Sequence, residues 1–143
     1  MDKITIIVPC YNEAEVVPHF YDAVETATAD IPDAAFTYLF IDDGSRDATL
    51  TAIRALAEVH TNVRYISFTR NFGKEPAMMA GLDYADGDAV ILMDADLQHP
   101  PSLIPAMVMH WRAGYDDVCG RRTDRADETW FKRTMANLFY RSM

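Results

Sequence analysis

Cysteine is scarce in this sequence of 143 residues, which contains only Cys10 and Cys119. The two lie far apart and neither belongs to a CxxC pair. Neither a disulfide framework nor a zinc site is therefore indicated, and we expect both thiols to be reduced.

Long hydrophobic runs are also lacking. The longest apolar stretches, residues 4–10 and 89–93, fall far short of the roughly 20 residues that a membrane-spanning helix needs. The N-terminus has no basic leader followed by a long apolar stretch. We expect these 143 residues to be soluble.

Basic residues are outnumbered, with 13 Lys and Arg against 22 Asp and Glu and a net charge of -9. Such a surface would repel the phosphates of a nucleic acid, which we exclude as a partner. The charge is uneven, since residues 1–119 hold 7 basic and 19 acidic side chains and residues 120–143 hold 6 and 3. The C-terminal segment is therefore expected to meet a different environment.

Half of the residues are apolar, which predicts one compact domain. Apolar runs rich in β-branched residues predict strands buried on two faces, and segments with helical spacing lie between them. This alternation favours an α/β fold with a mainly parallel sheet and helices on both faces. Strands are expected at residues 4–9, 38–41, 63–68, 89–93 and 117–119, and helices around residues 16–24, 50–57, 78–82 and 104–111.

Three residues are typical of helix ends. Asp47 is a candidate N-cap for the second helix, Pro76 suits the first turn of the third, and Gly114 can end the fourth. Residues 130–143 place Trp130 and Phe131 among basic side chains, which predicts either a basic amphipathic helix or an ordinary terminal helix packed on the core. That pattern has no stop signal, so we expect the sequence to be part of a longer chain.

Polar residues follow each of the first four expected strands. In open parallel sheets, ligands bind beyond the carboxyl ends of the strands, so these loops are expected to share one crevice. The clusters are residues 11–13, 42–45, 70–74 and 94–99.

The Asp94-Ala95-Asp96 triplet follows a buried strand, so its carboxylates are expected at the rim of the crevice. A divalent cation there could bridge the carboxylates and a diphosphate, with Gln98 as a further oxygen ligand. The alternative is that one Asp caps the next turn and the other is solvated. Because neighbouring loops are also polar, we favour the metal site.

Other loop residues have weaker signals. Asp42, at the end of its strand, could accept hydrogen bonds from a nucleobase, whereas Ser45 and Asp47 suit helix entry. Lys74 precedes a helix and could bind an anion, although a solvated lysine is an equal alternative. We interpret His99 as a loop residue rather than a ligand or a base.

Together, four motifs resemble those of family 2 glycosyltransferases, and most closely the polyprenyl-phosphate branch that contains dolichol-phosphate mannose synthases and bactoprenol-phosphate glucosyltransferases. The motifs are VPCYNE at residues 8–13, DDGS at 42–45, RNFGK at 70–74 and DADLQ at 94–98. The resemblance implies a GT-A (nucleotide-diphospho-sugar transferase) fold. It also implies inverting transfer of a hexose from a UDP- or GDP-sugar to a membrane polyprenyl phosphate, with Mg²⁺ or Mn²⁺.

The resemblance assigns roles to particular residues. Arg122 and Arg133 are expected to face the acceptor phosphate, and Asp94, Asp96 and Arg122 to serve catalysis by stabilising charge rather than as a general base. The metal is expected at Asp94, Asp96 and Gln98. The nucleotide-sugar is expected at Pro9, Tyr11, Glu13, Asp42, Lys74, Asp94, Ala95 and Asp96.

Residues 1–119 are thus expected to form the nucleotide-sugar-binding core, and residues 120–143 a basic segment of the same domain that faces the acceptor and the membrane. Relatives continue into membrane helices, which would hold the full-length protein at the cytoplasmic face of a membrane. Two alternatives stay open: a polysaccharide or other soluble acceptor, and nucleotide binding without transfer. A dinucleotide-binding module is disfavoured because the first loop lacks a GxGxxG turn. The oligomeric state is open, with a homo-oligomer among the alternatives.

Overall fold

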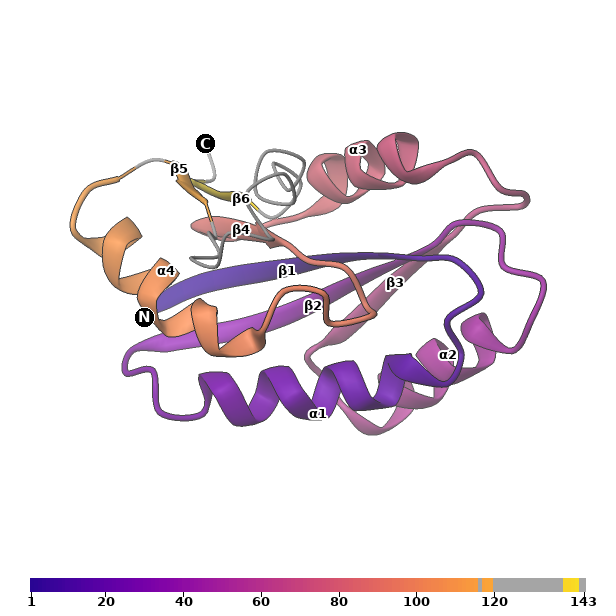
Figure 1. Ribbon diagram of the computed structural model, residues 1–143, viewed down its shortest axis with the longest axis horizontal. Coiled ribbons are helices and arrows are strands. Elements are labelled where there is room, and N and C mark those ends of the chain that lie inside the picture. Colours follow the sequence, from indigo (N-terminus) through magenta and orange to yellow (C-terminus); the bar gives the residue numbers. More distant parts are fainter. Residues whose placement is uncertain (116, 120–137, 142–143) are drawn as a thin grey trace, which may run out of the picture.

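The computed structural model describes residues 1–115, 117–119 and 138–141 (Figure 1). Strands and helices alternate along most of this chain, as the hydrophobic pattern predicts. The strands are β1 (Asp2–Cys10), β2 (Ala34–Asp42), β3 (Val63–Ser67), β4 (Ala89–Leu92), β5 (Asp117–Cys119) and β6 (Leu138–Arg141). The helices are α1 (Val16–Thr28), α2 (Thr49–Val59), α3 (Lys74–Tyr84) and α4 (Ile104–Arg112), with a short 3-10 turn η1 (Pro101–Leu103) before α4.

The strands form one mainly parallel sheet in the order β3-β2-β1-β4-β6-β5. β1 lies between β2 and β4 and is parallel to both. After β1 the chain builds outward through β2 and β3, and it then returns to the opposite side of β1 to form β4. The order of the strands therefore changes direction between β1 and β4.

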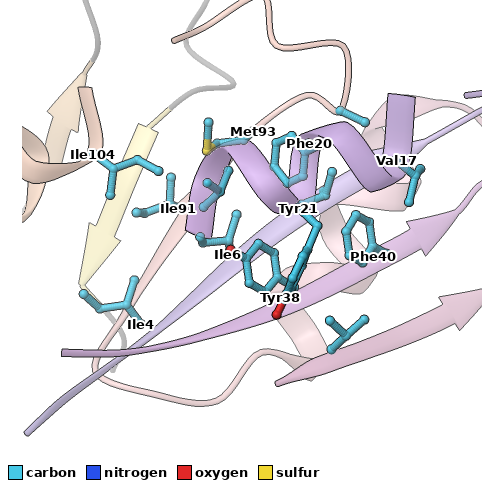
Figure 2. Close-up of a cluster of buried hydrophobic side chains, with 14 of the residues drawn as sticks. Ile4, Ile6, Val17, Phe20, Tyr21, Tyr38, Phe40, Ile91, Met93 and Ile104 are labelled. Carbon is cyan, nitrogen blue, oxygen red and sulfur yellow. The ribbon is translucent and has the colours of Figure 1, made fainter. Parts of the chain in front are cut away.

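Helices cover both faces of the sheet, as expected. Alternate residues of a strand point to opposite faces, so Ile6 joins the cluster under α1, α2 and α4, whereas Ile7 joins the cluster under α3. The larger cluster is built around Phe20, Tyr38 and Phe40, whose rings meet edge to face or stacked (Figure 2). Two buried faces explain why β4 and most of β1 are apolar runs, whereas the edge strand β3 is largely exposed.

Three expected helix-end signals can be compared with the structure. Pro76 lies in the first turn of α3, and Gly114 follows the end of α4 with a positive φ of 112°. The N-cap position of α2 is Ala48 rather than Asp47, although the Asp47 carboxylate accepts a hydrogen bond from the Thr49 N–H at 2.9 Å. Asp47 thus lies one residue before the N-cap position, and its side chain still binds the N–H of the first residue of α2.

The helix expected over residues 130–143 is wrong at its C-terminal end. Leu138–Arg141 is the strand β6, which pairs antiparallel with β4 on one side and with β5 on the other. Its apolar and aromatic residues have strand propensity as well as helical spacing, and the unpaired edge of β4 supplies a partner that is distant in the sequence. The rest of the expected helix lies outside the described residues.

No helix within the described ranges is long and apolar enough to cross a bilayer.

Gly81 of α3 packs directly against β1. A Cβ added there would lie 2.3 Å from Cγ2 of Ile7, a fully buried residue of β1. We predict that Gly81→Ala destabilises the chain by about 1–2 kcal/mol, because overpacking costs roughly 1–3 kcal/mol and the helix propensity gained is at most about 1 kcal/mol. Urea unfolding of the variant measures this.

As a control, Gly81→Ala is also made in a chain that carries Ile7→Ala, which lacks the methyl group in the way. In that chain Gly81→Ala should lower the free energy of unfolding clearly less. Equal costs in the two backgrounds would mean that contact with Ile7 is not what requires a glycine.

Candidate functional site

A cavity of about 250 Å³ opens at the carboxyl ends of β1 and β4, where the strand order changes direction. Open α/β sheets bind ligands at such a point, because the loops on either side leave in opposite directions and no crossover fills the space between them. The expected crevice is therefore present. Its lining residues are Pro9, Cys10, Tyr11, Glu13, Asp43, Lys74, Asp94, Asp96 and Gln98.

Asp94 and Asp96 enter this cavity from the turn after β4. Ala95 between them is fully buried, so it anchors the turn while both neighbouring side chains line the cavity. Leu97 has a positive φ of 59°, and its N–H donates to the Asp94 carbonyl, which closes the turn. The backbone N–H of Gln98 donates to Oδ1 of Asp96 at 3.3 Å. The expected metal ligands thus lie on one tight turn.

Lys74 reaches the same place from the other side of the cavity. It is the first residue of α3, and its Nζ lies 2.8 Å from Oδ1 of Asp94. The lysine side chain is half exposed, whereas the Asp94 side chain is 22% exposed. Sequence reasoning associated Lys74 with an anion, but the pairing with Asp94 became visible only in the folded chain.

Asp43 is a lining residue to which the sequence analysis assigned no role. Its buried carboxylate accepts hydrogen bonds from the backbone N–H groups of Phe72 (2.8 Å) and Gly73 (3.0 Å) and from Nδ2 of Asn71 (3.0 Å). Asp43 therefore holds the turn that leads into α3. Because Lys74 follows Gly73 directly, this carboxylate also positions the lysine.

Asp42, the aspartate that the sequence favoured for binding, is buried and is not among the lining residues of the cavity. Its Oδ1 accepts the Ser45 N–H at 3.2 Å. Adjacent residues at a strand end point in opposite directions, so which of the two aspartates reaches a cavity depends on how the loops pack. A nucleobase contact by Asp42 stays a prediction.

The loop after β1 is tied to the loop after β2. The Asn12 N–H donates to Oγ of Ser45 at 2.9 Å, and its side-chain Oδ1 accepts the Arg46 N–H at 2.8 Å. The Glu13 N–H donates to Oγ1 of Thr49 at 2.7 Å. Ser45 therefore joins two loops rather than capping α2. This network holds Tyr11, a residue that is 41% exposed, at the rim of the cavity.

Acidic side chains predominate among the charged residues that line the cavity, and their charges affect the pKa of Glu13. Burial raises the pKa of the Glu13 carboxyl above its ordinary value, and the negative charges of Asp96 and Asp94 raise it further. The Tyr11 N–H and the Lys74 ammonium act in the opposite direction. Burial also raises the pKa of the Cys10 thiol, and the negative charges of Glu13, Asp42 and Asp94 raise it further. A cation would relieve this repulsion.

His99, which the sequence predicts to be a loop residue rather than a ligand or a base, is buried and does not line the cavity. Arg122 and Arg133, expected at the acceptor phosphate, lie outside the described residues.

The donor set fits a hard cation that is shared with a ligand. In the part of the chain that the structure describes, no group of three or more His, Cys, Asp or Glu side chains could hold a metal ion. Mg²⁺ is commonly held by one or two carboxylates together with substrate phosphates rather than by an all-protein cage. Two carboxylates on one turn, with Gln98 beside them, match that arrangement.

Comparisons with known proteins bear on the family and on the fold. The model of the family described as Glycosyl transferase family 2 matches residues 5–142. A bactoprenol glucosyl transferase of Shigella phage SfV is 47% identical over 139 residues, which are 97% of this chain and 45% of that protein. The chain thus spans less than half the length of the curated relatives it matches.

Two solved structures resemble the fold. The mannosyltransferase PcManGT from Pyrobaculum calidifontis, in complex with GDP-Man and Mn²⁺, has a TM-score of 0.69 and 29% identity, covering 85% of this chain and 36% of its own. A TarS fragment from S. aureus with UDP has a TM-score of 0.73 and 20% identity, covering 98% and 47%. The expected GT-A fold is confirmed by these likenesses.

Asp43→Ala should destabilise the chain by about 2–4 kcal/mol, because buried N–H groups lose a charged acceptor. Urea unfolding measures the loss. Asp47→Ala is the matched control, since this carboxylate on the same loop is exposed, and it should lose much less. Equal losses would contradict the assignment of Asp43 as the residue that holds the turn into α3.

Glu13→Gln should raise the melting temperature of the ligand-free chain at neutral pH. A carboxyl whose folded pKa is raised binds its proton more tightly in the folded state, so stability falls as pH rises from its ordinary pKa through the folded pKa. Glutamine has no such dependence and can still accept the Tyr11 N–H. Scanning calorimetry should therefore find the advantage above this window and lose it at lower pH. A constant difference across pH would contradict this explanation.

Proposed function

The chain belongs to glycosyl transferase family 2, and we propose that its cavity binds the diphosphate of a nucleotide-sugar together with a divalent cation. The observation that carries the proposal is the pair Asp94 and Asp96 on one tight turn at the switch point of the sheet. Two carboxylates and a diphosphate repel one another. A bound Mg²⁺ or Mn²⁺ would neutralise both and stabilise the charge that grows on the diphosphate as the sugar departs.

The nucleotide is proposed to lie along the loop after β1. Tyr11 offers an exposed ring at the rim, and the Glu13 carboxyl can accept hydrogen bonds from hydroxyl groups or from a base. Pro9 lines the cavity beneath them, and Asp42 is kept as a candidate for the base. A purine or a pyrimidine nucleotide is compatible with the solved relatives, since PcManGT was solved with GDP-Man and a TarS fragment with UDP.

The acceptor is proposed to be a polyprenyl phosphate at a membrane surface. Support comes from the bactoprenol glucosyl transferases, which are 46% to 47% identical to almost the whole chain. Arg122 and Arg133 are the proposed phosphate contacts, since their guanidinium groups suit paired phosphate oxygens.

Transfer would join an acceptor phosphate oxygen to the anomeric carbon and break the bond between that carbon and the diphosphate oxygen, with inversion. An acceptor phosphate is already anionic at neutral pH, so it needs little help from a base. We therefore assign Asp94 and Asp96 to charge stabilisation and positioning rather than to proton abstraction.

A second proposed function is binding of the donor without transfer. Its support is that the lining of the cavity includes the residues proposed for the donor and the cation. Glycosyl transfer from UDP-glucose and GDP-mannose to a polyprenyl phosphate in detergent, with a soluble acceptor in parallel, distinguishes the two functions.

Calorimetric titration with UDP and GDP should show binding that requires Mn²⁺. Asp96→Asn should weaken Mn²⁺-supported binding by roughly ten- to a hundred-fold, the range typical of a damaged metal site. Asp83→Asn removes the same charge from the exposed side of α3 and should leave binding unchanged. Nucleotide binding that ignores Mn²⁺, or an equal loss in both variants, would contradict the proposed site.

A further inference from the structure

The ion pair between Lys74 and Asp94 has a consequence for the order in which ligands bind. Of the residues that line the cavity, four are acidic and Lys74 alone is basic. Its ammonium contacts Oδ1 of Asp94 at 2.8 Å, which is hydrogen-bonding distance for a charged pair. In the ligand-free protein, Lys74 therefore already supplies a positive charge to a carboxylate of the proposed cation site.

The backbone of Lys74 is held in this position by the fold. Gly73 has a φ of 107°, and its N–H is bound by the buried Asp43 carboxylate at 3.0 Å. Gly44 brings the two loops together, because a Cβ at this position would lie 2.1 Å from the carbonyl carbon of Arg70. These contacts hold the start of α3 beside the cavity. The Lys74 side chain can still move, since it is half exposed and has four rotatable bonds.

A divalent cation bound to Asp94 would lie beside the carboxylate whose Oδ1 the ammonium contacts. The Lys74 ammonium and a divalent cation are both positive, and like charges at contact distance repel strongly in a partly buried site. Cation binding to Asp94 would therefore require the Lys74 side chain to move away. A diphosphate in the cavity changes this balance, because its oxygens offer the displaced ammonium a new anionic partner close to the start of α3.

We propose that Lys74 is a tethered counterion of Asp94 that competes with the divalent cation when no donor is present and moves to the donor's diphosphate when both bind. Lys74 thereby couples the binding of the two ligands. The diphosphate draws the ammonium away from Asp94, and the cation that then binds Asp94 leaves the ammonium available to the diphosphate. The proposal rests on the proposed function. It goes beyond it by making Lys74 the residue that keeps cation affinity low until the nucleotide-sugar arrives.

The test measures Mn²⁺ affinity by the paramagnetic resonance signal of free Mn²⁺, first without nucleotide. Lys74→Met should bind Mn²⁺ about five- to twenty-fold more tightly than the unaltered chain, within the usual range of coupling between sites. Lys3→Met is the matched control: it removes the same charge from an exposed residue near the opposite end of β1 and should leave Mn²⁺ affinity unchanged.

The second arm repeats the titration with saturating UDP and with GDP. In the unaltered chain the effective nucleotide should tighten Mn²⁺ binding, and in Lys74→Met this gain should shrink. Lys74→Arg keeps the charge and should retain most of the coupling. Lys74→Gln serves as a second neutral variant, and calorimetric melting of each variant verifies folding.

The outcomes separate the two proposals. If neutral variants at Lys74 bind Mn²⁺ no better than Lys3→Met does, competition is refuted, while Mn²⁺-dependent nucleotide binding by the unaltered chain would still support the proposed function. Weaker nucleotide binding alone, with unchanged nucleotide-free Mn²⁺ affinity, would reduce Lys74 to a diphosphate contact and overturn the inference. If no nucleotide tightens Mn²⁺ binding to the unaltered chain, both the coupling and the proposed function fail.

Discussion

The structure depends on the position of β1, which pairs in parallel with β2 on one side and with β4 on the other. Because the chain must cross from β3 back past β1 to form β4, the loops after β1 and β4 diverge and leave space between them. The start of β4 is held to β1 by reciprocal contacts, since the Asp88 N–H donates to the Lys3 carbonyl and the Lys3 N–H donates to Oδ2 of Asp88. Its end is fixed by the Met93 N–H bound to the Ile7 carbonyl. One residue later, Asp94 lines the cavity.

A cavity with so many carboxylates would be unfavourable if each stood alone. The structure relieves the repulsion in three different ways. Backbone and side-chain N–H groups surround Asp43, the Lys74 ammonium pairs with Asp94, and Asp96 remains open to solvent. Glu13 is left partly buried among these charges and has a raised pKa as a result. Like charges held this close cost some stability in the ligand-free protein, and the cation proposed for this site would offset that cost.

Much of the fold could be predicted because the buried strands and amphipathic helices have distinct periodicities. The apolar runs ending at Pro9 and Met93 place the polar residues that follow them at the correct edge of the sheet. Two features could not be read from the sequence alone. Leu138–Arg141 has both helical spacing and strand propensity, and its partner β4 is remote in the sequence. Asp42 and Asp43 differ in role only through the direction in which each side chain points, and that direction depends on the packing of the loop that contains Asn71.

Sequence patterns alone are enough to predict the kinds and the order of the elements from β1 to β5, the edge of the sheet where the cavity opens and, through four motifs, the family. These properties follow from short-range periodicity and from residue types at fixed spacings, which a single chain displays directly. The folded chain was needed to show that Asp43 holds the turn into α3, that Asn12 and Ser45 join two loops, and that Lys74 contacts Asp94. Each of these contacts joins residues from different loops, and their distances depend on strand order and helix packing rather than on sequence separation.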